Sequence, residues 1–94
     1  MIQSFKSRRA RWILDGASPG KGFPPDLVEA ARRRLNYLNR AKALSELSFP
    51  AGNRLHALKG ERSGQWSISI NDQWRICFEW GSKGPEQVEI VDYH

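Results

Sequence analysis

The stretch GQWSISINDQWRICFEW, residues 64–80, decides the fold of this chain. It contains two runs, residues 66–70 and 74–80, in which large apolar side chains alternate with smaller or polar ones. Strict alternation is typical of strands that bury one face. Asn71 and Asp72 lie between the runs, and both residue types favour tight turns. The stretch therefore predicts an antiparallel β-hairpin.

The same alternation assigns side chains to the two faces of the hairpin. If Trp74 points toward a hydrophobic core, Arg75 points the other way and lies beside Ser67 and Ser69. We therefore expect one open sheet face that is polar and carries a guanidinium group.

Further strands are expected on both sides of the hairpin. Residues 81–86 (GSKGPE) predict a second turn that leads into a strand at residues 87–93. Residues 54–59 (RLHALK) are compatible with one more strand, and residues 2–5 (IQSF) predict a short opening strand.

Helical patterns occupy the first half of the chain. In residues 6–16, Ser7 is placed as an N-cap and Gly16 as a C-terminal stop. The apolar anchors of this helix are expected to be Trp12, Ile13 and Leu14. Residues 17–24 hold two glycines and two prolines and predict a loop.

A longer helix is expected to open at Pro25 and Asp26, because proline suits the first helical turn and an acid favours its positive dipole end. Helical spacing relates Leu27, Ala31, Arg34 or Leu35, and Leu38. Residues 42–47 predict another turn or two. The order of elements predicts one α+β domain over residues 1–94, a twisted antiparallel sheet of three to five strands with two or three helices packed on one face.

Composition limits the function classes. Fifteen Lys and Arg against ten Asp and Glu give a net charge of +5, which indicates either an anionic partner such as nucleic acid or a role in solubility. Cys77 is the one cysteine, so neither an intramolecular disulfide nor a cysteine-based metal site is expected. Residues 1–12 lack an apolar signal core and no run approaches the roughly 20 apolar residues of a membrane span. We therefore expect a cytoplasmic protein without a membrane segment.

Two clusters of titratable residues are candidates for a site. Residues 53–64 hold basic and acidic side chains around two glycines, which is typical of either an exposed charged loop or an anion-binding loop. The other cluster is at the end of the last expected strand. There Asp92 and His94 share one strand face about 7 Å apart, and Tyr93 lies on the opposite face. The two histidines, His56 and His94, lack the spacing of a metal site, so no metal is expected.

Residues 52–80 (GNRLHALKGERSGQWSISINDQWRICFEW) together with residues 88–94 (VEIVDYH) resemble the HigB-type toxins of bacterial type II toxin–antitoxin systems, in the RelE superfamily. The resemblance rests on LKG-x-R-x-G-x-W-S-I, W-R-I-x-F and D-Y-H in this order. The N-terminal half agrees only in its general pattern. The resemblance implies a microbial RNase fold and an endonuclease that cleaves mRNA in the A site of the 30S subunit without a metal or other cofactor.

The resemblance also implies the site and the partners. The matching positions are His56, Lys59, Arg75, Asp92, Tyr93 and His94. Arg75, Lys59 and Arg62 would bind phosphate, and His94 is the first choice for proton transfer. His56 would be a second acid–base group or a substrate-positioning residue, Asp92 an orienting group or base, and Tyr93 a stacking or phosphate-contacting group. The partner would be a cognate antitoxin, a HigA-like helix-turn-helix protein through which operator DNA is bound indirectly.

Other interpretations stay open at this point. The chain could be a non-catalytic or decayed nucleic-acid-binding member of the same fold, or it could cleave free RNA without the ribosome. Arg32, Arg33 and Arg34 are either a solvated helix face or a surface for ribosomal RNA or the antitoxin.

Overall fold

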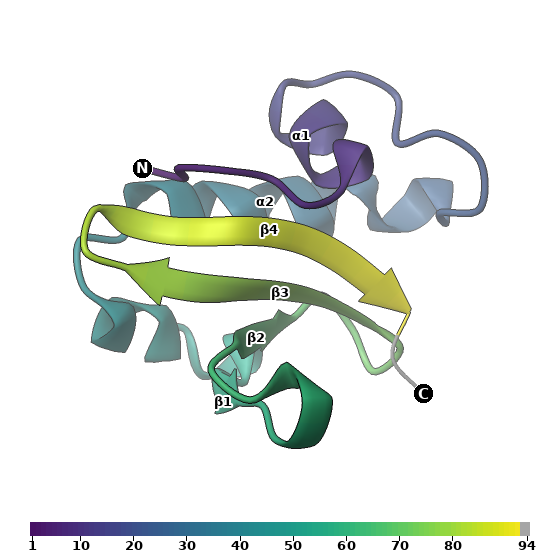
Figure 1. Ribbon diagram of the computed structural model, residues 1–94. Helices are drawn as coiled ribbons and strands as arrows, with labels where there is room; N and C mark the ends of the chain where they lie inside the picture. The colour runs from purple at the N-terminus through teal and green to yellow at the C-terminus, as the bar shows by residue number, and fades with distance from the viewer. Residues whose placement is uncertain (93–94) are drawn as a thin grey trace.

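The computed structural model describes residues 1–92, and within them an antiparallel sheet of four strands is covered by helices on one face (Figure 1). The strands lie side by side in chain order: β1 (His56–Ala57), β2 (Trp66–Ser69), β3 (Trp74–Gly81) and β4 (Gly84–Asp92). The described helices are α1 (Arg8–Leu14) and α2 (Val28–Arg40), with short 3-10 turns η1 (Pro25–Leu27), η2 (Leu44–Ser48), η3 (Ala51–Asn53) and η4 (Gly60–Arg62). The predicted α+β architecture is confirmed.

The β2–β3 hairpin forms as the alternation predicts. Ile68 and Ile76 are opposite each other and fully buried against the helices. The Oδ1 atom of Asn71 accepts hydrogen bonds from the backbone N–H groups of Gln73 (2.9 Å) and Trp74 (2.7 Å). This side-chain turn closes the hairpin and fixes the register in which Arg75 enters β3.

The predicted turn at residues 81–86 is too long. Gly81 and Gly84 are paired across the β3–β4 hairpin, so only Ser82 and Lys83 form the connection. Gly84 adopts φ 132°, a conformation that side chains disfavour, and this allows the tight reversal. Glycine and proline were correct signs of a turn, but they did not give its length.

A β-bulge lies in β4. The pairing shifts by one residue between Cys77 and Glu79, and Gln87 has a left-handed φ of 53°. Beyond this extra residue the alternation is regular again, with Val88 and Ile90 buried in the core.

The predicted opening strand is an extended segment beside β4, joined to it by one parallel bridge from Phe5 to Val88 (Figure 1). The N–H group of Gln3 donates to the carbonyl of Pro85, and that of Lys6 donates to the carbonyl of Val88; both N···O distances are 2.8 Å. The first residues of the chain thereby protect the outer edge of β4.

Helix α1 forms with the predicted cap. The Ser7 side chain accepts from the Ala10 N–H group, and Gly16 follows the helix with φ 83°. Ile13 is fully buried, whereas Trp12 keeps 41% of its surface exposed. The expectation that Trp12 anchors the helix was wrong, because a seven-residue helix offers one narrow face to the core and Trp12 lies beside it.

Helix α2 buries Ala31, Leu35 and Leu38 against the sheet, which agrees with their spacing. The predicted first turn is a separate 3-10 turn, η1, and the turn expected at residues 42–47 is the 3-10 turn η2. None of the helices in the described part of the chain is long and apolar enough to cross a membrane.

Two of the three consecutive arginines on α2 bond to neighbouring elements. Nε of Arg32 donates to the carbonyl of Ile13 (2.8 Å) at the end of α1. Nε of Arg34 donates to the carbonyl of Ser69 (3.0 Å) in β2. Arg33 is exposed. The triplet is therefore in part a structural clamp between helix and sheet.

Candidate functional site

The sheet face turned away from the helices, called the open face below, carries two rows of directly opposed side chains. The first row is His56, Ser67, Cys77 and Glu89, and the second is Ser69, Arg75 and Val91. Opposed residues in an antiparallel sheet point to the same side. The rows therefore bring together residues from all four strands.

Arg75 lies at the centre of the open face. Its Nη1 atom donates a hydrogen bond to the Ser67 hydroxyl over 3.0 Å, and the side chain is half-buried. The prediction that Arg75 lies beside Ser67 and Ser69 is confirmed. A guanidinium held in this way is a fixed, permanently charged donor for a phosphate group.

A second guanidinium reaches the first row from η4. Nη1 of Arg62 contacts Oε1 of Gln65 (3.0 Å) and Oε2 of Glu89 (3.2 Å). Nζ of Lys6, from the N-terminal segment, lies 3.6 Å from the same Glu89 oxygen. The Glu89 side chain is only 14% exposed. The open face is thus cationic around one sheltered carboxylate.

Cys77 lies beneath these charges and has no exposed surface. Its burial raises the pKa of the thiol. The positive charge of Arg62 opposes that shift, Glu89 adds to it, and Arg75 and Lys6 lower it again. Because burial dominates, the thiol stays neutral at physiological pH, and it packs the sheet rather than acting as a nucleophile.

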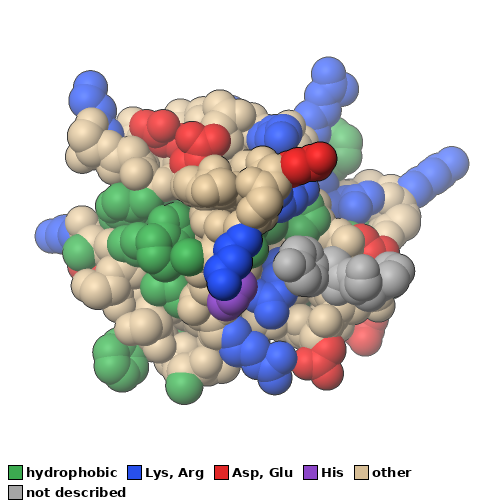
Figure 2. All heavy atoms as spheres, turned by 60° about the horizontal axis from the view of Figure 1, so that its bottom comes forward, with side chains coloured by type: hydrophobic (Ala, Val, Ile, Leu, Met, Phe, Trp, Pro, Cys, Tyr) green, Lys and Arg blue, Asp and Glu red, His purple; other side chains and the backbone are tan. Residues whose placement is uncertain are grey.

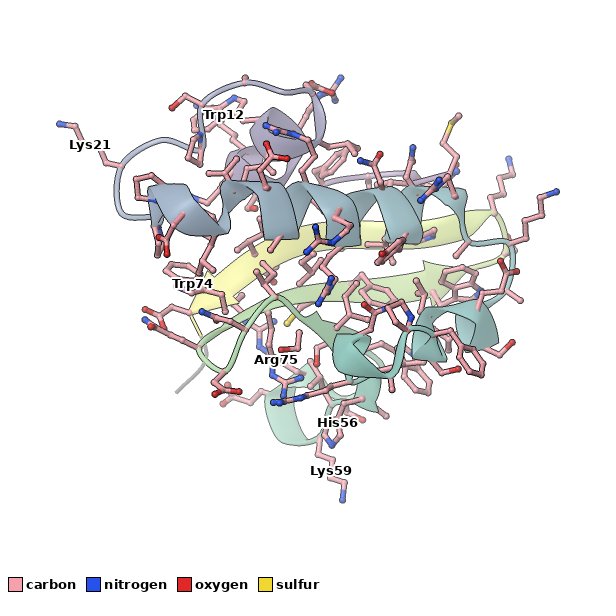
Figure 3. All side chains as sticks on the ribbon, turned by 180° about the vertical axis from the view of Figure 1, so that it is seen from behind. Trp12, Lys21, His56, Lys59, Trp74 and Arg75 are labelled. Atoms are coloured by element: carbon pink, nitrogen blue, oxygen red, sulfur yellow. The ribbon has the colours of Figure 1, made fainter. Side chains whose placement is uncertain are left out.

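His56 and Lys59 lie at the β1 end of the open face, and both are exposed. Figure 3 shows the two side chains next to each other below the sheet, with Arg75 nearby on the strands. In the space-filling view, Lys and Arg side chains gather around the histidine (Figure 2). His56, Lys59, Arg62 and Arg75 are therefore brought together on one surface from two separate segments of the chain.

Asp92 occupies a different position. It is paired with Trp74, so the register places it on the helix-facing side of β4, at the end of the strand. Its carboxylate oxygens accept from Nε2 of Gln73 over 3.2 and 3.3 Å. Alternation had placed Asp92 with His94 and apart from Tyr93; both of these residues lie outside the described part of the chain.

Glu89 and Lys6 also belong to this surface, although the sequence patterns did not predict them there. Alternation separates Glu89 from Asp92 and His94 on the last strand, and that separation was the available signal. No local pattern linked Lys6 to Glu89, because their contact depends on the N-terminal segment lying along β4.

Among residues 1–92 no group of three or more His, Cys, Asp or Glu side chains is arranged to hold a metal ion.

The fold and the site define a class of protein. A short antiparallel meander with helices on one face, and a cationic, histidine-bearing open face, is the architecture of a RelE-like α+β protein.

The chain belongs to the HigB-like toxin family: the family model described as RelE-like toxin of type II toxin–antitoxin system HigB matches residues 4–94. The chain is 32% identical to endoribonuclease HigB of Proteus vulgaris over 94 residues, which is the whole of both chains. It is also 32% identical to toxin HigB-1 of Vibrio cholerae serotype O1 over 80 residues, or 85% of this chain and 84% of that one. The resemblance seen in residues 52–80 and 88–94 is confirmed and extends through the N-terminal half.

Proposed function

We propose that this protein is an endoribonuclease that cleaves mRNA in the A site of the 30S ribosomal subunit and thereby stops translation. Membership in the HigB-like toxin family supports this proposal, and so does the name of the Proteus relative, endoribonuclease. The observation that carries it is the guanidinium of Arg75, which Ser67 holds on the same open face as His56.

The proposed reaction is an internal transesterification of RNA. The 2′-oxygen of one nucleotide attacks the adjacent phosphorus, the P–O5′ bond breaks, and a 2′,3′-cyclic phosphate and a 5′-hydroxyl are formed. A base takes the 2′-OH proton, and an acid gives a proton to the departing 5′-oxygen. Extra negative charge builds up on the two non-bridging phosphate oxygens, and cations placed there lower the barrier.

The described residues supply the electrostatic part of this chemistry. Arg75 is fixed by Ser67 and suits two-point binding of the non-bridging oxygens. Lys59 and Arg62 add positive charge to the same phosphate or its neighbours. His56, exposed at the edge of this surface, is a second acid–base group or a residue that positions the substrate.

The remaining assignments concern the last residues of the chain. We assign the main proton transfer to His94, because imidazole titrates near neutral pH. Asp92 orients that histidine or serves as a base, and Tyr93 stacks on a base or contacts the phosphate. Asp92 reaches this role from the end of β4 rather than from the open face.

The proposed partner is a cognate antitoxin, as expected of a toxin from a type II system. We propose a HigA-like helix-turn-helix protein that neutralises the toxin and carries it to operator DNA.

The test is primer extension on mRNA in a translation extract supplied with purified protein. We expect cleavage within ribosome-bound codons, and loss of cleavage when the nucleotide 5′ to the cut carries a 2′-deoxyribose. Arg75→Ala and His94→Ala should each lower cleavage by at least about 10²-fold, whereas Arg33→Ala, on exposed α2 surface, is the matched control.

Three results would contradict the proposal in different ways. Intact mRNA with retained RNA binding would favour the non-catalytic interpretation. Equal cleavage of mRNA without ribosomes would favour an enzyme that acts on free RNA. A cut that persists at a 2′-deoxyribose would exclude attack by the 2′-OH group.

A further inference from the structure

We propose that Glu89 is a positioning residue: its carboxylate holds Arg62 over the open face and sets where that guanidinium meets the substrate. This inference rests on the proposed function, because the substrate phosphate is the one that the endoribonuclease would cleave.

The contacts of Glu89 come from two distant segments. Arg62 lies 3.2 Å and Lys6 3.6 Å from the same oxygen, Oε2. The carboxylate is sheltered, with 14% of the side chain exposed, while the Arg62 side chain is 37% exposed. A sheltered ion pair with a second cation is held more firmly than an isolated surface pair.

The path of Arg62 across the sheet shows what the contact does. The loop that carries Arg62 connects β1 to β2 and is closed by a bond from the Leu58 N–H group to the Gln65 carbonyl (2.9 Å). Glu89 lies two strands beyond, on β4, across from Cys77. The guanidinium therefore extends over the first row, where Arg75 also bonds to Ser67. Glu89 is the anchor at the far end of this span.

A carboxylate on this face needs an explanation, because a negative charge weakens binding of any polyanion. A direct catalytic role is disfavoured by its surroundings: both cations contact Oε2 and little of the side chain is open to solvent. A role through Arg62 fits both facts. The carboxylate lowers overall attraction for RNA but keeps one donor in a fixed place, which is where transition-state stabilisation is gained.

The proposal predicts two opposite effects of Glu89→Gln, a change that keeps the shape of the side chain and removes its charge. Affinity for a 2′-O-methyl RNA oligonucleotide should rise, with the slope of log K against log salt steeper by up to about 0.7 for one added phosphate contact. The single-turnover cleavage rate of ribosome-bound mRNA should fall by about 10- to 100-fold, because Arg62 is no longer held in place.

Glu79→Gln is the matched control. Glu79 is on the same strand as Cys77 with one residue between them, is exposed, and has the same charge, yet no ion pair to it is found in the described part of the structure. It should raise RNA affinity to a similar or smaller extent and leave the cleavage rate unchanged.

A double-mutant cycle tests whether Glu89 acts through Arg62. In an Arg62→Ala background, Glu89→Gln should cause no further loss of rate, and the losses of melting temperature should likewise be less than additive. Additive losses of rate or of melting temperature, or a wild-type rate in Glu89→Gln, would overturn the inference while leaving the proposed function intact. Absence of cleavage by the wild-type protein in the same assay would instead reject the proposed function.

Discussion

Arginine side chains in this protein serve two different purposes that their number in the sequence does not reveal. Arg32 and Arg34 donate to backbone carbonyls of α1 and β2 and tie the layers together. Arg75 and Arg62 lie on the open face and bond to side chains there. A rigid, always-charged fork suits both purposes, because it satisfies buried carbonyls as well as phosphates.

Arg75 can be tested for fork geometry as distinct from charge. Arg75→Lys keeps the positive charge but loses the planar fork of two donor nitrogens, and we expect cleavage to fall by about 10²–10³-fold, nearly as far as in Arg75→Ala. Ser67→Ala, which removes only the bond that orients Arg75, should cost less, about fivefold for one hydrogen bond. Single-turnover cleavage rates, compared between variants with similar melting temperatures, measure the effects of both substitutions. A lysine variant with the wild-type rate would show that charge alone suffices.

Cys77 gives a pH-dependent prediction for stability. Burial raises its pKa in the folded protein, so above about pH 8.5 the thiol of the unfolded chain ionises first. Ionisation of the thiol then stabilises the unfolded state. The free energy of unfolding therefore falls with rising pH, by up to about 1.4 kcal/mol per pH unit from this group. Urea titrations at pH 7 and 9.5 should show a larger drop for wild type than for Cys77→Ala. An equal drop in both proteins would contradict the assignment.

How far single residues could be predicted depended on their neighbours in the chain. Alternation placed Arg75 beside Ser67, because strand periodicity is a local property. The exposure of Trp12 and the partners of Glu89 depend on which distant segments cover them, and periodicity carries no such information. The resemblance, rather than periodicity, groups His56 with Asp92, and the register places these two residues on different faces of the sheet.

At the scale of elements, the β3–β4 hairpin and the N-terminal segment support each other. The backbone of Gly84 approaches Met1 so closely that an added Cβ atom would lie 2.6 Å from the Met1 carbonyl oxygen. The amides of Gln3 and Lys6 bond to β4 just beyond this point. The hairpin turn therefore also sets the position of the segment that delivers Lys6 to Glu89.

Gly84→Ala should disturb this arrangement. The added Cβ atom would make the close contact with Met1, and the left-handed backbone would be strained by about 1–3 kcal/mol. We therefore expect lower stability together with faster hydrogen exchange at the amides of Gln3 and Lys6. Gly16→Ala is the control, because Gly16 has φ +83° but open space around its Cβ position. It should lose stability through strain alone and keep both amides protected. Equal hydrogen exchange at Gln3 and Lys6 in the two variants would show that the hairpin turn does not set the position of the N-terminal segment.

The elements that sequence predicted well are those with a strong period. In the two central strands and α2, large apolar side chains line the face toward the core, so their patterns repeat over several residues. The short 3-10 turns η2 and η3 bury single residues such as Leu47 and Asn53, which leaves no period to detect. Strand β1 is two residues long because it pairs only at His56 and Ala57, whereas its composition was compatible with six residues.

At the scale of the whole molecule, the net charge of +5 is a total that does not specify where the positive charge lies. Lys and Arg side chains gather near the histidine on the face shown in Figure 2. Part of the remaining positive charge is used in internal contacts, as on α2. Attraction for RNA should therefore come from the surface around β1 and η4 rather than from the total charge.

Salt dependence of RNA binding tests this distribution. Lys59→Ala should flatten the slope of log K against log salt by about 0.7, the value for one lost contact to single-stranded RNA. Arg33→Ala removes the same charge from exposed α2 surface and should leave the slope unchanged. Fluorescence anisotropy with a 2′-O-methyl oligonucleotide between 50 and about 200 mM salt would measure both. Equal slopes in the two variants would mean that binding senses only net charge.

The bulge at Gln87 has a consequence for how this chain can change length. Because β4 carries one surplus residue there, deletion of Gln87 would restore a regular ladder and leave Val88, Glu89 and Ile90 on their present faces. Deletion of a residue between 88 and 92 would instead exchange core and open-face side chains over part of the strand. Length variation in this hairpin should therefore be tolerated at the bulge and selected against beyond it, where a shift of one residue would move Glu89 into the core.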